Sequence, residues 1–162
     1  MLRPFRETDR ADLYEFLAQL EDDEFEGYPG ITWENCLPHL RERLESTEYL
    51  AIELKETGRV IGNICLGDRD CMAKEAGCIV NERFRRRGYA AEALSAAVDD
   101  AFRSGVHRVY AQCDPRNERS WRLLEKVGFR REALLRQNVF FHRDALGEPI
   151  WKDTFIYARL NE

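Results

Sequence analysis

The sequence predicts a mixed α/β fold in a single domain, residues 1–162, and three observations support this prediction. An apolar run at 78–80 is typical of a buried strand, and a helical period begins at Ala90 after a polar connection. Beyond this helix, residues 108–113 alternate between polar and apolar side chains, as a strand with one buried face does. A strand, a long helix and a second strand in this order are expected to form parallel neighbours in one sheet.

The N-terminal part of the chain is expected to form a short strand and two helices. The strand lies at 2–6, and Thr8 can cap a first helix that continues to about residue 20. Thr32 can cap the second helix, in which Pro38 removes a backbone donor, so this helix is either kinked or begins near residue 36. The apolar stripe expected on its buried face consists of Trp33, Leu37, Leu40 and Leu44.

The remaining elements complete the sheet and cover it. Residues 49–54 and 60–66 are separated by turn residues and are expected to form a hairpin. The central helix should end at Gly105, and Asn117 can cap a short helix that ends at Gly128. Further strands are expected at 72–80, 129–138 and 150–160, with loops at 67–71 and 140–149. We therefore expect about four helices around one mixed sheet.

Composition and charge argue against several classes of protein. The net charge is −5, whereas a nucleic-acid-binding protein is usually basic over its working face. No apolar run is long enough to cross a membrane, and the N-terminus lacks the apolar core of a signal peptide. The five cysteines contain no Cys-x-x-Cys pair and the three histidines are scattered, so we expect no metal site. These features predict a reduced, cytoplasmic protein without membrane or nucleic-acid partners.

The connection between the central strand and the long helix has the features of an anion-binding site. A helix N-terminus presents free N–H groups and a partial positive charge. Gly88 lets a ligand approach the backbone closely, and Ala90 is nearly as small. The arginines at 85–87 add guanidinium groups, which match phosphate oxygens. We infer a cradle for phosphate or pyrophosphate; the alternative is a solvated basic loop that opens an alanine-rich helix.

Two motifs resemble the GNAT superfamily of N-acetyltransferases. The run Arg85-Arg86-Arg87-Gly88-Tyr89-Ala90 is similar to the Arg/Gln-x-x-Gly-x-Gly/Ala motif that binds the acetyl-CoA pyrophosphate in that family. The segment 117–129, with its Asn-x-x-Ser and Glu-Lys-x-Gly-Phe sequences, resembles the branch that contains the Rim-type ribosomal-protein alanine N-acetyltransferases. Segments 2–9 and 151–153 also resemble this branch, so the resemblance covers nearly the whole chain in the same order.

The resemblance implies a sheet that is mostly antiparallel, with a central parallel strand pair that splays apart around the acetyl group of acetyl-CoA. Backbone N–H groups from Ile79 to Val80 would polarise the thioester carbonyl. Asn117 would bind the pantetheine arm, and Ser120 would hydrogen-bond or protonate the departing sulfur, unless it is only a polar residue of a first helical turn. The pyrophosphate would be held by Arg85, Arg86, Arg87, Gly88, Tyr89 and Ala90.

The general acid and base are less well marked in the sequence. Leu124 stands where many GNAT enzymes carry a tyrosine that acts as general acid. Glu132 matches a base proposed in Rim-type enzymes, and the alternative is an exposed strand residue paired with Arg130 or Arg131. Two further carboxylates are candidates: Glu75 is a weaker candidate for the base, and Asp153 is expected to bind substrate or to be structural.

The acceptor is expected to be a primary amine. Supplying a neutral amine at pH 7 costs about 1.4 kcal/mol for an α-amine and about 4.6 kcal/mol for a lysine. Without a tyrosine donor, an α-amine such as a protein N-terminus is slightly favoured, and a small amine such as an antibiotic or polyamine is the alternative. The acidic stretch 21–26 is either a solvated loop or an electrostatic guide for a cationic amine. A catalytically silent acyl-CoA-binding module, and either a monomer or a homodimer, also fit the sequence.

Overall fold

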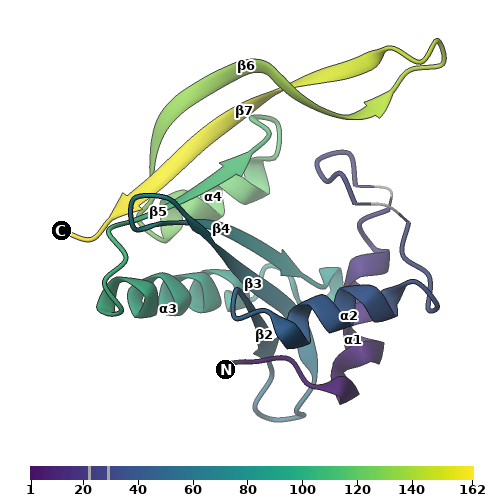
Figure 1. The fold of residues 1–162 in the computed structure, drawn as a ribbon, viewed down its shortest axis with the longest axis vertical. Helices are drawn as coiled ribbons and strands as arrows, with labels where there is room; N and C mark the ends of the chain where they lie inside the picture. The colour runs from purple at the N-terminus through teal and green to yellow at the C-terminus, as the bar shows by residue number, and fades with distance from the viewer. Residues whose placement is uncertain (22, 29) are drawn as a thin grey trace.

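The computed structural model describes residues 1–21, 23–28 and 30–162, and within them the chain forms one mixed sheet of seven strands. The strands follow the order β1-β2-β3-β4-β5-β7-β6, and every neighbouring pair is antiparallel except β4 and β5 (Figure 1). The strands are β1 Leu2–Arg3, β2 Tyr49–Glu53, β3 Val60–Arg69, β4 Ala73–Val80, β5 Arg108–Cys113, β6 Arg130–Arg143 and β7 Pro149–Leu160. The α-helices in these residues are α1 Arg10–Ala18, α2 Cys36–Glu45, α3 Tyr89–Arg103 and α4 Glu118–Lys126, and the short 3-10 helices are η1 Glu7–Asp9 and η2 Glu82–Phe84.

The predicted parallel pair is confirmed, and it opens after a short paired stretch. β4 and β5 are in register only at Ala73–Arg108, Lys74–Val109 and Glu75–Tyr110. Beyond these pairs, β4 stays bonded to β3 as far as Val80, and β5 stays bonded to β7 as far as Cys113. The C-terminal parts of β4 and β5 therefore separate, and the sheet opens between its two halves.

Two hydrophobic cores lie on the two faces of this sheet. One packs α3 and α4 against the central strands, and its buried residues include Leu94, Val98, Val109 and Leu124. The other packs α1 and α2 against β2 and β3, with Leu13, Phe16, Leu17 and Leu40 among its buried residues. The helical period predicted from Ala90 is confirmed, because Leu94, Ala97, Val98 and Ala101 are buried on one face of α3. Ala90 itself is half-buried, and Ala93 is buried as well.

The start of α2 resolves the two alternatives for Pro38. The helix begins at Cys36, so Pro38 lies in its first turn, where a backbone donor has no intrahelical acceptor. Thr32 is not the cap as predicted, because it exchanges hydrogen bonds with Asn35 one turn before the helix. The predicted stripe was wrong at Trp33 and Leu44, which are 43% and 38% exposed.

Four other sequence expectations are corrected. β1 ends at Arg3 rather than residue 6, and Thr8 lies inside η1, so that Asp9 precedes α1. Residues 67–69, expected in a loop, continue β3. The expected loop at 140–149 is largely strand, because β6 continues to Arg143 and β7 begins at Pro149. The resulting β6–β7 hairpin extends beyond the rest of the sheet (Figure 1).

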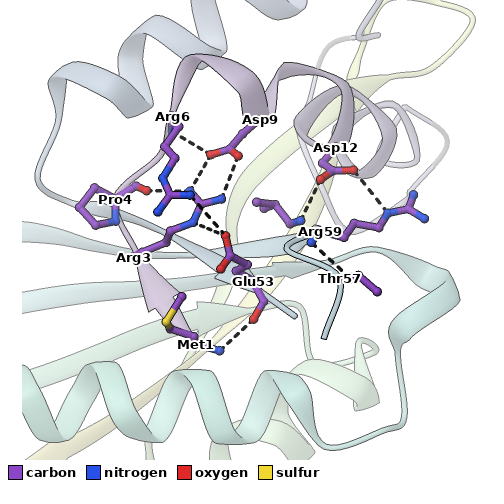
Figure 2. Close-up of polar contacts among 10 residues, drawn as sticks. Met1, Arg3, Pro4, Arg6, Asp9, Asp12, Glu53, Thr57 and Arg59 are labelled. Carbon is purple, nitrogen blue, oxygen red and sulfur yellow. Dashed lines mark hydrogen bonds and ion pairs between the residues drawn. The ribbon is translucent and has the colours of Figure 1, made fainter. Parts of the chain in front are cut away.

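The N-terminal strand is fixed by a buried ion-pair cluster (Figure 2). Arg3 donates to both carboxylate oxygens of Asp9 at 2.8 and 2.9 Å, and its Nε donates to Glu53 at 2.5 Å. The side chains of all three residues are at most 10% exposed. These carboxylates raise the pKa of the Arg3 guanidinium further above its ordinary value, so the cluster stays charged while it holds β1 and η1 on β2.

Candidate active site

The N-terminus of α3 is open in the way that the sequence predicts. Gly88 precedes the helix with a φ of 89°, a left-handed conformation that glycine adopts without strain. Within the described residues, no atom apart from those of the adjacent backbone lies within 4 Å of the position that a Cβ would take at Gly88. The N–H of Glu92 bonds the carbonyl of Gly88, so the N–H groups of Tyr89, Ala90 and Ala91 have no intrahelical acceptor. These groups can bind an anion.

The three arginines before Gly88 differ in their surroundings. Arg85 is half-buried, and its Nε donates to the carbonyl of Val80 at 3.0 Å. Arg86 is exposed and has a φ of 62°, and Arg87 is exposed with its guanidinium 5.7 Å from the ring centre of Phe84. Arg85 therefore links the cradle to the end of β4, while Arg86 and Arg87 are free to approach a ligand from solvent.

Ile79 and Val80 lie where β4 has separated from β5. Both residues keep their register with β3, opposite Asn63 and Gly62. In the described residues, the other edge of β4 has no strand neighbour beyond Glu75. Peptide groups on this edge can therefore pair with a ligand, as the resemblance implied.

The N-terminus of α4 borders the same opening from the β5 side. The predicted cap is confirmed, since the Asn117 side chain accepts a hydrogen bond from the Ser120 N–H at 3.3 Å. Ser120 is half-buried beside Cys113, the last residue of β5. Burial raises the pKa of the Cys113 thiol, and a hydrogen bond with Ser120 opposes that rise. Leu124, at the position of the absent tyrosine, is 4% exposed and packs in the core.

Glu132 is an ion-paired residue, but its partner is neither Arg130 nor Arg131 as the sequence suggested. Arg108 donates to both of its carboxylate oxygens, at 2.9 and 2.5 Å. This hydrogen bonding holds the pKa of the Glu132 carboxyl below its usual range. Arg108 is the first residue of β5, where β4 and β5 are still paired. The pair thus holds the Glu132 carboxylate toward the closed end of the strand pair.

Glu75 lies at the point where the two strands begin to separate. Its carboxylate accepts hydrogen bonds from Tyr110 at 3.2 Å and Gln112 at 3.0 Å, both on β5. Arg69 of β3 adds an ion pair at 2.8 Å. Glu75 therefore bridges β3, β4 and β5 next to the opening, with all of its hydrogen bonds made to protein groups.

Two hollows adjoin the β6–β7 hairpin. One of about 320 Å³ lies past the end of β5, between Asp114 and the strand residues Trp151 and Asp153. Asp153 accepts a hydrogen bond from the N–H of Gln137, so it has a structural contact and also lines the hollow. The other, of about 410 Å³, lies along residues 131–134 and Phe155. Sequence analysis did not predict these hollows, because their lining residues are brought together only by the pairing of β5, β6 and β7.

Across residues 1–21, 23–28 and 30–162, no three or more His, Cys, Asp or Glu side chains are grouped to hold a metal ion. In the same part of the chain, no helix has the length and apolar character needed to cross a membrane.

Comparisons with known proteins agree with this geometry. Residues 1–130 match the family described as the acetyltransferase (GNAT) domain. The uncharacterised N-acetyltransferase YnaD of Bacillus subtilis (strain 168) is 26% identical over 168 residues, an alignment that spans 100% of this chain and 94% of YnaD.

Solved structures share the fold. A GNAT-family acetyltransferase from Bacillus anthracis superposes with a TM-score of 0.88 at 24% identity, over 99% of this chain and 93% of that one. The ribosomal-protein-alanine N-acetyltransferase of Brucella melitensis gives a TM-score of 0.78 at 21% identity, over 99% of each chain. The predicted resemblance is confirmed by the family match over most of the sequence. The chain therefore belongs to the GNAT acetyltransferase family and is an N-acetyltransferase.

Proposed function

We propose that this enzyme transfers the acetyl group of acetyl-CoA to a primary amine, with a protein N-terminal α-amine as the first acceptor to test. The observation that carries the proposal is the position of the open α3 N-terminus beside the separated ends of β4 and β5. A pyrophosphate at the helix end would direct the rest of the donor into the opening of the sheet.

The donor would be held by groups from three elements. The pyrophosphate would accept hydrogen bonds from the N–H groups of Tyr89 and Ala90, across the surface left open by Gly88. Arg86 and Arg87 would supply charge from the solvent side, and Arg85 from the end of β4. These residues fit an anionic ligand, since the cradle combines free N–H groups, open space and guanidinium groups.

The acetyl group would lie between β4 and β5. The backbone N–H of Val80 would stabilise the negative charge that develops on the carbonyl oxygen, whereas the alternation along β4 turns the peptide groups of Ile79 toward Asn63 of β3. Asn117, at the start of α4, would contact the pantetheine arm. Ser120 would donate a hydrogen bond to the sulfur as it leaves, the role that the buried Leu124 cannot fill.

The sequence gives two candidates, Glu132 and Glu75, for the general base that deprotonates the acceptor amine. Glu132 is weakened in this role by its ion pair with Arg108, which stabilises the carboxylate and lowers its basicity. Glu75 lies at the opening, but its oxygens accept hydrogen bonds from Arg69, Tyr110 and Gln112.

The test combines thiol release from acetyl-CoA over a panel of amines with calorimetric binding of CoA. The panel holds alanine-initiated peptides, polyamines and aminoglycosides, so that the class that reacts identifies the acceptor. Gly88→Glu should abolish CoA binding, because it places a carboxylate in the cradle. Gly58→Glu is the matched control, since Gly58 also has a positive φ and open space around it but lies in the β2–β3 turn.

A second pair of variants tests charge alone. Arg87→Glu should weaken CoA binding at least about tenfold, because each charge-assisted contact contributes about 1.5–3 kcal/mol. Arg41→Glu makes the same charge change on the exposed surface of α2 and should leave binding unaltered. If the protein binds CoA tightly but no amine in the panel causes release of the thiol from acetyl-CoA, the silent binding module is favoured. Unaltered CoA binding in Gly88→Glu and Arg87→Glu would contradict the proposed cradle.

A further inference from the structure

The segment that joins β4 to the donor cradle (residues 85–90) is bonded to α1. This segment, residues 81–84, contains η2. The Asn81 Nδ2 donates to Glu15 Oε1 of α1 at 3.0 Å. The Glu82 N–H donates at 2.9 Å to Oε1 of Gln19, the residue that follows α1. Because α1 packs in the core on one face of the sheet and α3 in the core on the other, the entry to the cradle is fixed from the face opposite α3.

Asn81 transmits this contact to the backbone. It directly follows β4 and is 1% exposed. Its N–H donates to the Ile61 carbonyl at 2.8 Å, and its carbonyl accepts from the Phe84 N–H at 2.9 Å. Its Oδ1 accepts from the Arg83 N–H at 3.1 Å and so caps η2. With its Nδ2 bonded to Glu15, the amide is held at both ends, and its orientation sets the turn that leads into the cradle.

Glu15 also reaches the cradle by a second route. Its other carboxylate oxygen pairs with Arg59 of the β2–β3 turn, and the Arg59 Nε lies 3.3 Å from Asp12 of α1 (Figure 2). The Arg59 guanidinium lies 5.5 Å from the ring centre of Phe84, and the Arg87 guanidinium lies 5.7 Å from the same ring. Arg59 therefore supports the ring on which a cation of the cradle rests.

The contacts of Glu15 are those of a positioning group. The Arg83 Nη1 donates to the oxygen that also accepts from Asn81, at 3.2 Å. The hydrogen bond from Asn81 lowers the pKa of the Glu15 carboxyl, burial opposes this effect, and the charges of Arg59 and Arg83 add to the lowering. The carboxylate is therefore ionised at neutral pH. Both of its oxygens have protein partners, so it orients protein groups and offers no free acceptor to a ligand.

We propose that Glu15 is a positioning residue for donor binding, which holds Asn81 and Arg59 and through them sets the position of the cradle. The inference rests on the proposed function, because it requires that residues 85–90 bind the pyrophosphate of acetyl-CoA. Loss of Glu15 raises the Kd for CoA and the KM for acetyl-CoA. Saturating acetyl-CoA restores the bound arrangement, so kcat is retained.

The first test exchanges the two partners and measures calorimetric binding of CoA. Asn81→Asp replaces the amide donor by a second carboxylate that faces Glu15, and it should weaken CoA binding about tenfold. Adding Glu15→Gln supplies a donor from the other side of the contact. The double variant should therefore bind CoA more tightly than Asn81→Asp alone, within about threefold of the wild type.

The second test removes the carboxylate. Glu15→Ala should weaken CoA binding about tenfold. Asp99→Ala is the matched control, because Asp99 of α3 is a partly exposed carboxylate that pairs with Arg159 at 2.9 Å. This variant also loses an ion pair between elements, but the pair lies away from residues 81–90, so CoA binding should stay within about twofold of the wild type. Thermal unfolding of both variants shows whether their losses of stability are comparable.

Hydrogen exchange measures the effect on the cradle without turnover. Peptides that cover residues 81–88 should exchange faster in Glu15→Ala than in the wild type, because the cap on η2 is loosened. The same peptides should exchange at the wild-type rate in Asp99→Ala. Faster exchange confined to α1 in Glu15→Ala would show that the contact does not hold the cradle, and would overturn the inference.

Kinetics separate positioning from a general loss of structure. In Glu15→Ala the KM for acetyl-CoA should rise about tenfold, with kcat within about threefold. A fall in kcat with unchanged KM overturns the inference, as does a double variant that binds CoA no better than Asn81→Asp. Either result leaves the transferase intact. Wild-type protein that binds no CoA overturns the proposed cradle, and the role of Glu15 with it. Wild-type protein that binds CoA but acetylates no amine overturns the proposed transfer, while the binding and exchange measurements still decide the role of Glu15.

Discussion

The spacing between β3 and β4 at Gly62 gives the sharpest test of the proposed carbonyl site. Gly62 lies opposite Val80 in the register of the two strands. A Cβ at this position would lie 2.1 Å from the carbonyl oxygen of Ile79 and 2.9 Å from the Cα of Val80. Both are backbone atoms, so no side-chain rotation relieves the contact. Gly62→Ala must therefore displace the segment that is proposed to bind the thioester carbonyl.

The expected magnitudes follow from this geometry. Overpacking of this kind costs about 1–3 kcal/mol, which for a chain of this size lowers Tm by about 2–12 °C. A shift of the oxyanion-binding N–H group by about 1 Å lowers kcat about 100-fold. Calorimetric unfolding and the thiol-release assay measure the two effects on the same preparation.

Gly77→Ala is the matched control on the same strand pair. A Cβ at Gly77 would have its nearest neighbour 3.7 Å away, at the Cβ of Cys65, which is an ordinary contact. We expect its stability to stay within about 0.5 kcal/mol of the wild type and its activity to be retained. If Gly62→Ala matches Gly77→Ala in both Tm and kcat, the close approach at Ile79 does not position the site.

Two further predictions concern ion pairs. Arg3→Met leaves the buried Asp9 carboxylate without its partner and should lower the free energy of unfolding in urea by about 3–5 kcal/mol. Arg6→Met is the control, because the Arg6 side chain is 63% exposed, and it should lower the free energy of unfolding by under about 1 kcal/mol. Equal losses in the two variants would refute a special role for Arg3. Arg108 depresses the pKa of Glu132 in the folded state, so the stability that this pair contributes is present above the unfolded value of about 4.3 and is lost as pH falls below it. The stability difference between the wild type and Glu132→Gln should therefore be constant above about pH 6 and shrink as pH falls below about 4.3, and a difference that does not shrink in acid would contradict this assignment.

The donor side of the site could be predicted because its signals are local in the sequence. Gly88, Gly105 and Gly128 stand where helices begin or end, and each adopts a φ between 88° and 94° that glycine permits at no steric cost. Asn117 caps the next helix through its own side chain, three residues from its partner. The parallel pairing of β4 and β5 follows from the single helix that connects them.

The acceptor side could not be predicted because its contacts are between distant residues. Glu132 is paired with Arg108, which lies 24 positions away in the sequence and is brought close by the β5-β7-β6 strand order. Sequence reasoning could consider only the adjacent arginines. The hairpin was partly misassigned because irregular register between Leu135 and Val139, and again before Arg143, breaks the alternation that identifies strands. Arg43 is buried in place of Leu44, since its guanidinium lies 4.5 Å from the Tyr49 ring and donates to the Tyr28 hydroxyl.

The connectivity of the sheet explains why its centre opens. β4 is paired along its whole length with β3, and β5 along its whole length with β7, so each half of the sheet is held by antiparallel neighbours. The three register pairs at the base join the halves, and Glu75 fixes the end of this joint through Tyr110 and Gln112. Beyond Glu75, the peptide groups on the facing edges of β4 and β5 form no hydrogen bonds to another strand in the described chain. Such groups favour a hydrogen-bonding partner when solvent is excluded. A ligand with its own amide groups can provide that pairing, so the same opening that weakens the sheet creates the binding surface.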